Sequence, residues 1–268
     1  MMAILRPAVS IVIPTYNERD RLAEVVHTTL RVFGLAGIAV EIVVVDDNSP
    51  DGTGALADQL ATQLPVKVVH RPGKLGLGTA VIDGFAVASA PLVGVMDGDS
   101  SHPPDLVPVM MAALEETGAD FAIGSRYVPG GGTRNWSSWR EGLSRAACIL
   151  ARVITPVRDA TSGFFLIAHD TVGGVTIAHG GFKICLELLV HSRAQRVVEV
   201  PYVFIGREVG QSKMNLREAA GYFRQVWDLW RDVRGRRGPR VEHVVLSPVQ
   251  VAALRERLGL AGSATAQC

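Results

Sequence analysis

Short apolar, β-branched runs alternate with longer stretches of helical spacing through the first half of the sequence, and this rhythm limits the fold most. The apolar runs cover residues 9–13, 41–45, 66–69, 92–96 and 120–123. The helical stretches between them cover residues 18–33, 53–64, 76–88 and 104–116. Such alternation is typical of βαβ units. It predicts an α/β protein with a doubly wound, mostly parallel sheet and helices on both faces.

Charge and cysteine usage narrow the classes of function. The chain carries 27 Lys and Arg against 26 Asp and Glu. This balance argues against binding of nucleic acid through the net charge of the whole protein. Any electrostatic contact with a membrane must be local. Cys148, Cys185 and Cys268 are widely spaced without a CxxC pattern, which predicts neither a disulfide framework nor a structural zinc. No uncharged apolar stretch reaches about 18 residues, and we expect no membrane-spanning helix and a cytoplasmic location.

Polar residues gather immediately after the predicted strands. In open α/β sheets, ligands bind beyond the carboxyl ends of the strands, so these positions are the first place to look for a site. They are 14–18, 46–49, 71–74, 97–99 and 125–127. All of them belong to the same predicted edge of the sheet.

Asp97 and Asp99 follow the strand at 92–96 and are separated by Gly98. Two carboxylates at a strand end can bind a hard divalent cation, whose other ligands are the phosphate oxygens of a nucleotide. A solvated turn is the alternative reading of such a pair. The position at the strand end favours a metal site.

Asp46 and Asp47 follow the strand at 41–45. A carboxylate there can accept hydrogen bonds from a nucleobase or a ribose hydroxyl, and we assign that contact to one of them. Nearby Ser49 and Asp51 are expected to shape the turn into the next helix.

Cationic side chains lie farther along the chain. Arg126 follows the strand at 120–123, and Arg207 and Lys213 belong to a predicted loop at 206–213. A diphosphate leaving group and a phosphate acceptor both need cationic partners. Ordinary surface cations are the alternative interpretation of each residue alone.

Taken in order, these motifs resemble those of the family-2 glycosyltransferases and, more narrowly, the dolichyl- or polyprenyl-phosphate mannose synthases. The resemblance covers roughly residues 9–233. The motifs that carry it are Pro14-Thr15-Tyr16-Asn17-Glu18, the run from Val45 to Thr53, Asp97-Gly98-Asp99 with Ser101-His102-Pro103-Pro104, Gly124-Ser125-Arg126-Tyr127, and Ser212-Lys213.

The resemblance implies a GT-A fold and inverting transfer of mannose from GDP-mannose to a polyprenyl (dolichyl) monophosphate, with Mg²⁺ or Mn²⁺ as cofactor. It also implies a role for each matching residue. The nucleoside pocket would be lined by Pro14, Tyr16, Glu18, Val45 and Asp47. Asp97, Gly98 and Asp99 would reach ribose and metal. The donor and acceptor phosphates would be held by Arg126, Arg207 and Lys213, which with Asp99 form the predicted catalytic set. Arg140 and Ser162 are further candidates for the acceptor phosphate.

The sequence departs from the family pattern beside the metal. Gly98 stands where the family usually has Ala, and Ser101 where many members have Gln as a further metal ligand. Ser101 is therefore a third, poorer ligand candidate. His102 precedes two prolines and is expected to pack or cap rather than bind metal.

Two other functions stay open. The same fold could use UDP-glucose and act as a polyprenyl-phosphate glucosyltransferase, or the chain could be a non-catalytic nucleotide-sugar-binding module. A dinucleotide-dependent oxidoreductase is disfavoured because Gly76 and Gly78 lack a third glycine at the fingerprint spacing.

The predicted organisation has three parts: a catalytic domain at 1–213, a basic amphipathic helix at 214–240 and a C-terminal tail at 241–268. Additional elements are expected at 141–153, 182–194 and 248–258 as helices, at 164–167 and 197–204 as strands, and at 130–132 as a loop. The amphipathic helix could lie on an anionic membrane surface or pack on the domain with a solvated face. The first reading makes the protein a peripheral one on the cytoplasmic face of the membrane.

Overall fold

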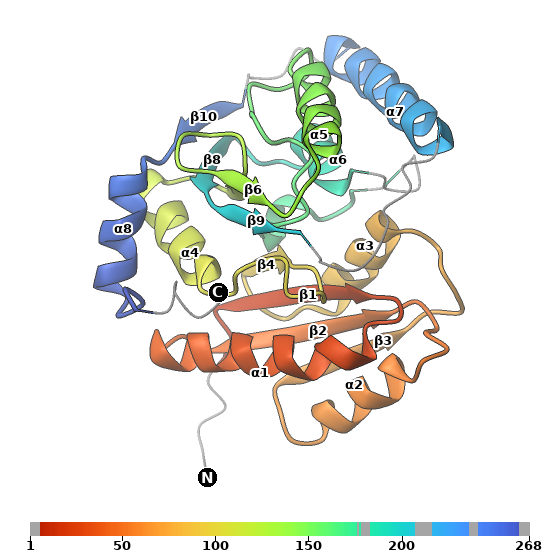
Figure 1. Ribbon diagram of the computed structural model, residues 1–268, viewed down its shortest axis with the longest axis vertical. Helices are drawn as coiled ribbons and strands as arrows, with labels where there is room; N and C mark the ends of the chain where they lie inside the picture. The colour runs from red at the N-terminus through yellow and green to blue at the C-terminus, as the bar shows by residue number, and fades with distance from the viewer. Residues whose placement is uncertain (1–5, 176, 178–182, 207–215, 236–240, 263–268) are drawn as a thin grey trace.

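The computed structural model describes residues 6–175, 177, 183–206, 216–235 and 241–262, and Figure 1 shows their arrangement. The strands are β1 (Val9–Thr15), β2 (Val40–Asp46), β3 (Val66–His70), β4 (Leu92–Val95), β5 (Phe121–Ser125), β6 (Gly132–Arg134), β7 (Phe165–Ala168), β8 (Arg196–Pro201), β9 (Val203–Ile205) and β10 (Glu242–Val245). The helices are α1 (Arg19–Leu35), α2 (Thr53–Ala61), α3 (Leu77–Val87), α4 (Leu106–Thr117), α5 (Ser138–Ala151), α6 (Ile184–His191), α7 (Leu216–Gly235) and α8 (Pro248–Arg257), with a 3-10 turn η1 (His169–Thr171).

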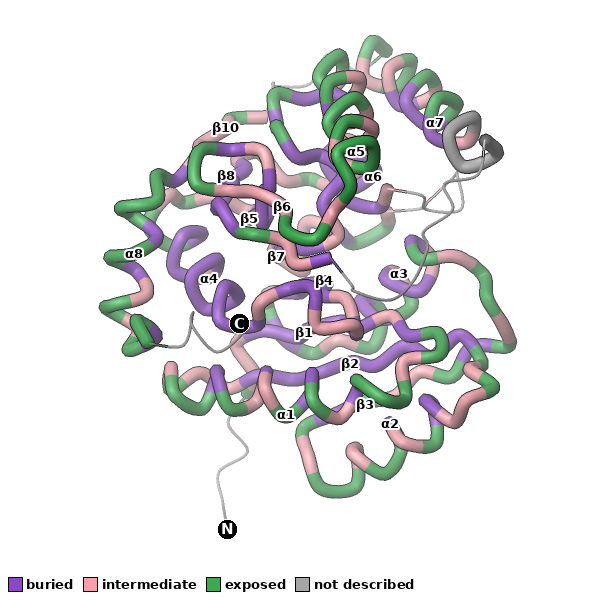
Figure 2. Tube along the Cα trace, viewed as in Figure 1, coloured by how far each residue is buried: buried purple, intermediate pink, exposed green. Residues whose placement is uncertain are grey.

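The central sheet has eight strands in the order β10-β8-β5-β7-β4-β1-β2-β3. β7 runs antiparallel to β4 and β5, and the other neighbours are parallel. The predicted α/β class with a mostly parallel sheet is therefore confirmed. β1 and β2 cross the interior as almost continuously buried segments, as expected for parallel strands covered on both faces (Figure 2).

Side chains alternate between the two faces of the sheet and build two cores. On one face, Ile11 and Ile13 of β1 pack with buried residues of α1, α2, α4 and α8. On the other, Val12 packs with buried residues of α3, α5, α6 and α7. The period of two along each strand thus explains why helices cover both faces, as predicted.

The segment after residue 241, which we expected to be a tail, belongs to the sheet. β10 pairs in parallel with β8, in the register Glu242↔Arg196 to Val245↔Glu199. α8 follows through a capping box at Ser247, and its Val251 and Leu254 are buried in the same core as α4. The correction has a physical reason: a four-residue edge strand that begins with Glu and His carries too little periodicity to be seen in sequence.

A second sheet also differs from expectation. The predicted loop at 130–132 leads into β6, which pairs in parallel with β9. The predicted strand at 197–204 is divided at Tyr202, whose N–H donates to Ser125 O and whose carbonyl accepts from Gly132 N–H. α5 starts at Ser138, earlier than expected, because Ser137 caps it by accepting the Arg140 N–H.

α7 packs on the domain through one side. Its Tyr222, Val226 and Leu229 are buried in the second core, while Phe223 and Trp227 are exposed. Within the described ranges, none of the helices combines the length and apolar character needed to cross a membrane.

Candidate active site

The carboxyl ends of β1, β2, β4 and β5 bring most of the predicted site residues to one edge of the sheet. β1 lies between β2 and β4, with parallel register to both. The loops that follow these strands therefore start side by side (Figure 1). This confirms the placement of 14–18, 46–49 and 97–99 on a shared edge.

The two adjacent aspartates after β2 have different environments. Asp46 accepts hydrogen bonds from the Ser49 N–H at 3.0 Å, the Ser49 hydroxyl at 2.5 Å and the Thr15 hydroxyl at 3.3 Å. These contacts use Asp46 to tie β1 to the loop after β2. Asp46 is therefore a structural residue that holds these two segments together.

Asp47 is held by a buried arginine that the sequence reading gave no role. Arg71 Nη1 lies 2.5 Å from Asp47 Oδ1, and its Nη2 donates to Thr79 Oγ1 at 2.5 Å. Arg71 is 5% exposed. Burial raises the pKa of Asp47, and the Arg71 charge only partly opposes this. Arg71 thus fixes the orientation of Asp47, and its position directly after β3 was the available sequence signal.

Tyr16 and Lys74 form the exposed rim of the same region. Lys74 Nζ lies 4.5 Å from the centre of the Tyr16 ring. Tyr16 is exposed, so its ring presents a face on which a base could stack. Pro14 is partly buried, and Val45 is fully buried and packs with the core residues of α3. Val45 is therefore part of the core beneath this edge of the sheet.

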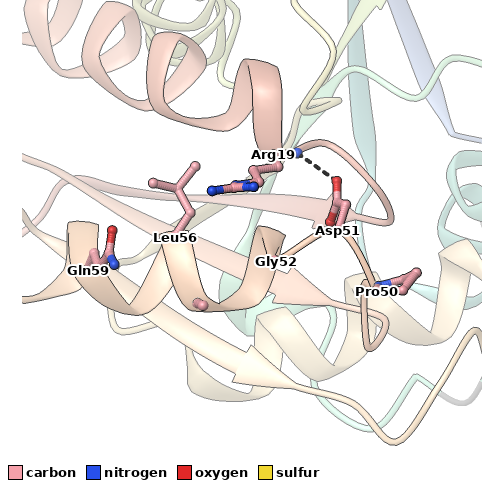
Figure 3. Close-up of a pocket in the computed structure, with 7 residues that line it drawn as sticks. Arg19, Pro50, Asp51, Gly52, Leu56 and Gln59 are labelled. Carbon is pink, nitrogen blue, oxygen red and sulfur yellow. Dashed lines mark hydrogen bonds between the residues drawn. The ribbon is translucent and has the colours of Figure 1, made fainter.

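Figure 3 shows how the supporting loops are joined beside α1 and α2. Asp51 accepts hydrogen bonds from the N–H groups of Arg19 and Thr53, and the Thr53 hydroxyl accepts the Glu18 N–H. A cavity of about 310 Å³ lies there, lined by Arg19, Pro50, Asp51, Gly52, Ala55, Leu56 and Gln59. These contacts confirm that Asp51 shapes the turn, and they connect the loop of Glu18 to that of Asp47.

The turn after β4 orients the second acidic residue of the predicted metal site. Ser100 adopts a left-handed backbone with φ of 65°. This turn lets Asp99 Oδ1 accept hydrogen bonds from the Ser101 N–H at 3.0 Å and the Ser101 hydroxyl at 2.5 Å. Ser101 is 4% exposed. Its hydroxyl therefore points at Asp99 and supports that carboxylate.

His102 supports Asp97, the first acidic residue of the predicted metal site, from the buried side. Its Nδ1 accepts the Asp97 backbone N–H at 3.0 Å, and its Nε2 lies 3.7 Å from Asp97 Oδ2. The ring stacks on Phe164 with centroids 4.8 Å apart. Burial lowers the pKa of His102 despite the opposing charges of Asp97 and Asp99. A neutral ring with its proton on Nε2 fits these contacts, and the expected packing role of His102 agrees with them.

The carboxylates of Asp97 and Asp99 suit Mg²⁺ or Mn²⁺, which prefer hard oxygen ligands. In the described part of the chain, no group of three or more His, Cys, Asp or Glu residues could by itself hold a metal ion. A cation bound here would take its remaining ligands from water or from the phosphates of a nucleotide, and this is the donor set typical of nucleotide-bound Mg²⁺.

Arg126, which follows β5, is more deeply buried than we expected for a residue that contacts phosphates. Its Nε and Nη2 donate to the two carboxylate oxygens of Asp159 at 2.8 and 2.7 Å. Arg126 is 8% exposed and Asp159 is fully buried. Burial lowers the pKa of Arg126, but the Asp159 pair outweighs it and raises that pKa. The guanidinium is a fixed, paired cation and does not project into solvent.

A second layer holds Asp159 from the strands behind it. Glu199 of β8 accepts the N–H groups of Arg158 and Asp159 at 2.8 and 2.9 Å. His243 of β10 lies 2.6 Å from Glu199 Oε2. Sequence reasoning missed Glu199 and His243, because their partners are 40 residues or more away in the chain.

The remaining predicted residues divide into three cases. Arg140 is exposed on the first turn of α5, with its guanidinium 4.2 Å from the Trp136 ring. Ser162 is 2% exposed and its hydroxyl donates to Gly124 O at 2.7 Å, so it is part of the fold and not an open phosphate contact. Arg207 and Lys213 lie outside the described residues.

Comparison with known proteins assigns the chain to a family. The signature of glycosyl transferase family 2 matches residues 10–186. The chain belongs to glycosyl transferase family 2. This confirms the predicted family, and with it the GT-A type of fold and the class of enzyme.

Named relatives support the narrower resemblance. The glycosyltransferase is 42% identical over 225 residues to a dolichol-phosphate mannosyltransferase of Pyrococcus furiosus, covering 82% of this chain and 63% of the relative. It is 42% identical over 224 residues to a polyprenol monophosphomannose synthase of Mycolicibacterium smegmatis, covering 78% of this chain and 83% of the relative. The chain thus spans less than two thirds of the length of the first of these relatives.

A solved structure has the same fold at low identity. A mannosyltransferase from Pyrobaculum calidifontis, in complex with GDP-Man and Mn²⁺, superposes with a TM-score of 0.57 at 19% identity. The superposition covers 97% of the glycosyltransferase and 74% of that structure.

Proposed function

We propose that this glycosyltransferase transfers mannose from GDP-mannose to a polyprenyl monophosphate, with inversion at the sugar and dependence on a divalent cation. The observation that carries the proposal is that Asp47 follows β2 and Asp97 and Asp99 follow β4, the two strands that flank β1, so that all three carboxylates lie at one edge of the sheet. The names of the 42% identical relatives support mannose as the sugar and a polyprenyl phosphate as the acceptor.

The donor side binds the nucleotide. Asp47, fixed by Arg71 at 2.5 Å, accepts hydrogen bonds from the nucleobase. Tyr16 offers its exposed ring to the base, and Glu18 and Pro14 close the sides of the pocket. Because these groups are held before the donor arrives, little ordering is needed on binding.

The two carboxylates after β4 serve the diphosphate. Asp97 and Asp99 would hold Mg²⁺ or Mn²⁺, which supplies positive charge to the departing diphosphate. Ser101 and His102 act on these carboxylates from inside the protein, through the contacts at Asp99 Oδ1 and at the Asp97 N–H. They keep both acidic side chains directed toward the donor.

The acceptor needs positioning more than activation. A phosphate monoester is already an anionic nucleophile near neutral pH, so no dedicated base has to remove a proton. We assign the acceptor phosphate to Arg140, which is exposed on the first turn of α5. Arg207 and Lys213, which lie outside the described residues, remain proposed as further phosphate contacts. Arg126 contributes through its fixed charge beside Trp136, whose ring lies 5.5 Å from the guanidinium.

We further propose that the catalytic unit, assigned from sequence to residues 1–213, also takes in β10 and α8, and that residues 214–240 contact the cytoplasmic face of a membrane. The exposed Phe223 and Trp227 beside the exposed Arg224 and Arg231 support this contact.

The test is transfer of radiolabelled sugar to a short polyprenyl phosphate. We expect lipid-linked product from GDP-mannose with Mg²⁺ or Mn²⁺, and a loss of about 10³-fold in Asp99→Ala, as removal of several kcal/mol of charge stabilisation requires. Equal product from UDP-glucose would contradict the assignment of GDP-mannose as the donor and favour a polyprenyl-phosphate glucosyltransferase. Nucleotide binding without transfer from either donor would indicate that the chain is a nucleotide-sugar-binding module and not an enzyme.

A further inference from the structure

β10 and α8 form one packed unit after residue 241, which we call the C-terminal unit (residues 242–257). β10 is the outermost strand next to β8, and α8 lies alongside α4 (Figure 1). Leu246, Val251 and Leu254 of the unit are buried in the same core as α4. These apolar contacts fix the unit to the domain. Two of its polar side chains, His243 and Arg255, pair with acidic residues of the domain.

His243 of β10 reaches the group that holds Arg126. Its Nε2 lies 2.6 Å from Glu199 Oε2, and Glu199 is fully buried. Glu199 accepts the N–H groups of Arg158 and Asp159, and Asp159 pairs with the guanidinium of Arg126 through both carboxylate oxygens. A buried carboxylate is stable only with donors around it. His243 therefore helps to fix Glu199 and, through it, Asp159.

The start of α8 supports the loop that follows Arg126. Gly130 in this loop has a left-handed backbone with φ of 88°. A Cβ at this position would lie 2.5 Å from Pro248 Cγ, so only glycine lets the loop pack directly on the first turn of α8. The same loop leads to Trp136, whose ring lies 5.5 Å from the Arg126 guanidinium. The C-terminal unit thus supports the surroundings of Arg126 through two separate contacts.

Arg255 of α8 reaches the turn that carries the predicted metal ligands. It pairs with Asp105, the N-cap residue of α4, and the two side chains are only 17% and 9% exposed. Asp105 follows His102 by three residues, with two prolines between them, and His102 accepts the Asp97 N–H. Because proline fixes φ, this short connection has little backbone freedom. A shift of Asp105 would therefore move His102 and the support of Asp97.

The same two elements carry ion pairs that lie away from the site. Glu242 of β10 pairs with Arg196 at the start of β8, and Arg257 of α8 pairs with Glu116 in the last turn of α4, each at 2.6 Å. All four side chains are exposed. They belong to the opposite end of the sheet from the carboxyl ends of the strands. The unit therefore offers two pairs beside the site and two matched pairs far from it.

We propose that the C-terminal unit positions both sides of the site. His243 positions Arg126 through two buried carboxylates. Arg255 positions the turn of Asp97 through the N-cap residue of α4. Both are positioning residues, because each acts through another side chain. The consequences for donor and acceptor rest on the proposed function, whereas the positioning of the two segments does not.

The first test follows hydrogen exchange of the full chain by mass spectrometry and needs no activity. His243→Phe should speed exchange about tenfold at 157–161, where the acceptor of the Asp159 N–H is loosened, and leave 97–105 as in wild type. Arg255→Met should do the reverse. Exchange in β2 serves as the reference for a global loss of stability. Unchanged exchange at both segments in the two folded variants would overturn the proposal.

The matched controls are Glu242→Gln and Arg257→Met, which remove the two exposed pairs of the same unit. Both should exchange as wild type does at 157–161 and at 97–105. Equal changes in the controls would overturn the proposal, since any ion pair of the unit would then have the same effect.

Conservative variants keep the test valid if a variant does not fold. His243→Gln and Arg255→Lys each keep a donor for the facing carboxylate, so their effects should be smaller than those of His243→Phe and Arg255→Met but larger than those of the controls. Exchange equal to that of the controls, where the larger substitutions do not fold, would overturn the proposal.

The second test separates positioning from stability, well below the unfolding temperature. His243→Phe should raise the KM for a short polyprenyl phosphate about tenfold and leave the KM for GDP-mannose within about twofold, because Arg126 shifts and the donor side does not. Arg255→Met should raise about tenfold the Mn²⁺ concentration at which GDP is half bound, measured by calorimetry. A purely structural role would lower the unfolding temperature and leave these constants unchanged, and that result would overturn the proposal.

The two proposals can fail separately. No transfer by the wild-type protein, with the exchange pattern as expected, would overturn the proposed function and support the positioning role of the C-terminal unit. Transfer by wild type with equal kinetic constants in all variants would support the proposed function and overturn the positioning role.

Discussion

The proposed donor side, with Asp47, Asp97 and Asp99, and the proposed acceptor side, with Arg126, differ in the range of the contacts that hold them. On the donor side, several carboxylates take hydrogen bonds from residues two or three positions along the chain, as in Asp46 with Ser49, Asp51 with Thr53 and Asp99 with Ser101. Longer-range contacts add to these, such as that of Arg71 with Asp47, 24 residues apart. On the acceptor side, Arg126 depends on Asp159, 33 residues away, and Asp159 depends on Glu199, 40 residues farther. The individual turns of the donor side are therefore shaped in part by neighbouring residues, whereas Arg126 and Asp159 on the acceptor side are held by contacts that join distant segments.

The sharpest way to test this contrast is to remove Asp159. Asp159→Ala leaves the buried Arg126 without its partner, and the free energy of unfolding should fall by about 3–5 kcal/mol. Chemical denaturation measures the change. Asp159→Asn, which keeps the shape and one acceptor, should lose less. A loss below about 1 kcal/mol in the alanine variant would mean that Arg126 finds another partner and that the acceptor side is not held by this pair.

His102 tests how the acidic pair of the donor side is supported. His102→Phe keeps a ring against Phe164 but removes the acceptor of the Asp97 N–H. We expect transfer to fall about tenfold and the metal concentration for half activity to rise, because support for a metal ligand is typically worth about 10–100-fold. His102→Asn, which restores an acceptor, should recover part of the activity. Equal loss in both variants with unchanged metal dependence would assign His102 to packing alone.

His243 tests how much β10 contributes to the stability of the acceptor side. His243→Phe leaves the buried Glu199 without its side-chain partner, and unfolding should require about 1–3 kcal/mol less free energy. In a double-mutant cycle with Glu199→Gln, the two losses should not add, because one contact is removed twice. Simple additivity would show that the β10 contact and the 158–159 loop are independent.

Asp51 gives the donor-side counterpart and a pH dependence. Partial burial raises the pKa of Asp51, but the hydrogen bonds from Thr53 and Arg19 outweigh it and keep that pKa below its usual range. The carboxylate therefore adds stability above the unfolded pKa of about 3.9, and this stability disappears as pH falls through the lower folded pKa. Asp51→Ala should cost about 1–2 kcal/mol at neutral pH. In denaturant titrations the difference from wild type should shrink below that range, and a constant difference would contradict the assignment.

Gly98 should show the smallest effect. A Cβ at this position would lie 3.2 Å from Ile13 Cγ2 and 3.4 Å from Thr15 Cγ2, both methyl groups that can shift slightly. Gly98→Ala should change stability by less than about 1 kcal/mol and leave transfer within about threefold of wild type. A larger loss of transfer would show that the tight turn between Asp97 and Asp99 has no room for the methyl group that other family members carry.

Most of the donor side could be predicted from sequence because its signals are local. Strand periodicity placed 9–13, 41–45 and 92–96, and the rule that ligands bind at strand ends singled out the pair Asp46-Asp47 and the pair Asp97 and Asp99. The choice of Asp47 over Asp46 came from the family resemblance. The sequence also distinguished the shaping role of Asp51 from nucleoside contact. It did not assign a partner to Asp47, since nothing in the order of residues shows that Arg71 turns inward.

The acceptor side was less predictable because its contacts join distant segments. Arg126 looks like an open cation in the sequence, yet its pairing with Asp159 is visible only once β5 lies next to the 158–163 turn. β10 was mistaken for a tail for the same reason: four residues gain strand structure by pairing with β8, not from their own propensity.

The sequence alone determined the α/β class, the mostly parallel sheet, the family and the acidic edge, because periodicity and short motifs are encoded by neighbouring residues. The tertiary structure decided which of the polar residues are open and which are buried supports. Arg126, Ser101 and Ser162 are buried supports, whereas Trp139 and Ile149 of α5 are exposed. Burial depends on what packs against a residue, and that is settled only when strands and helices distant in the chain come together.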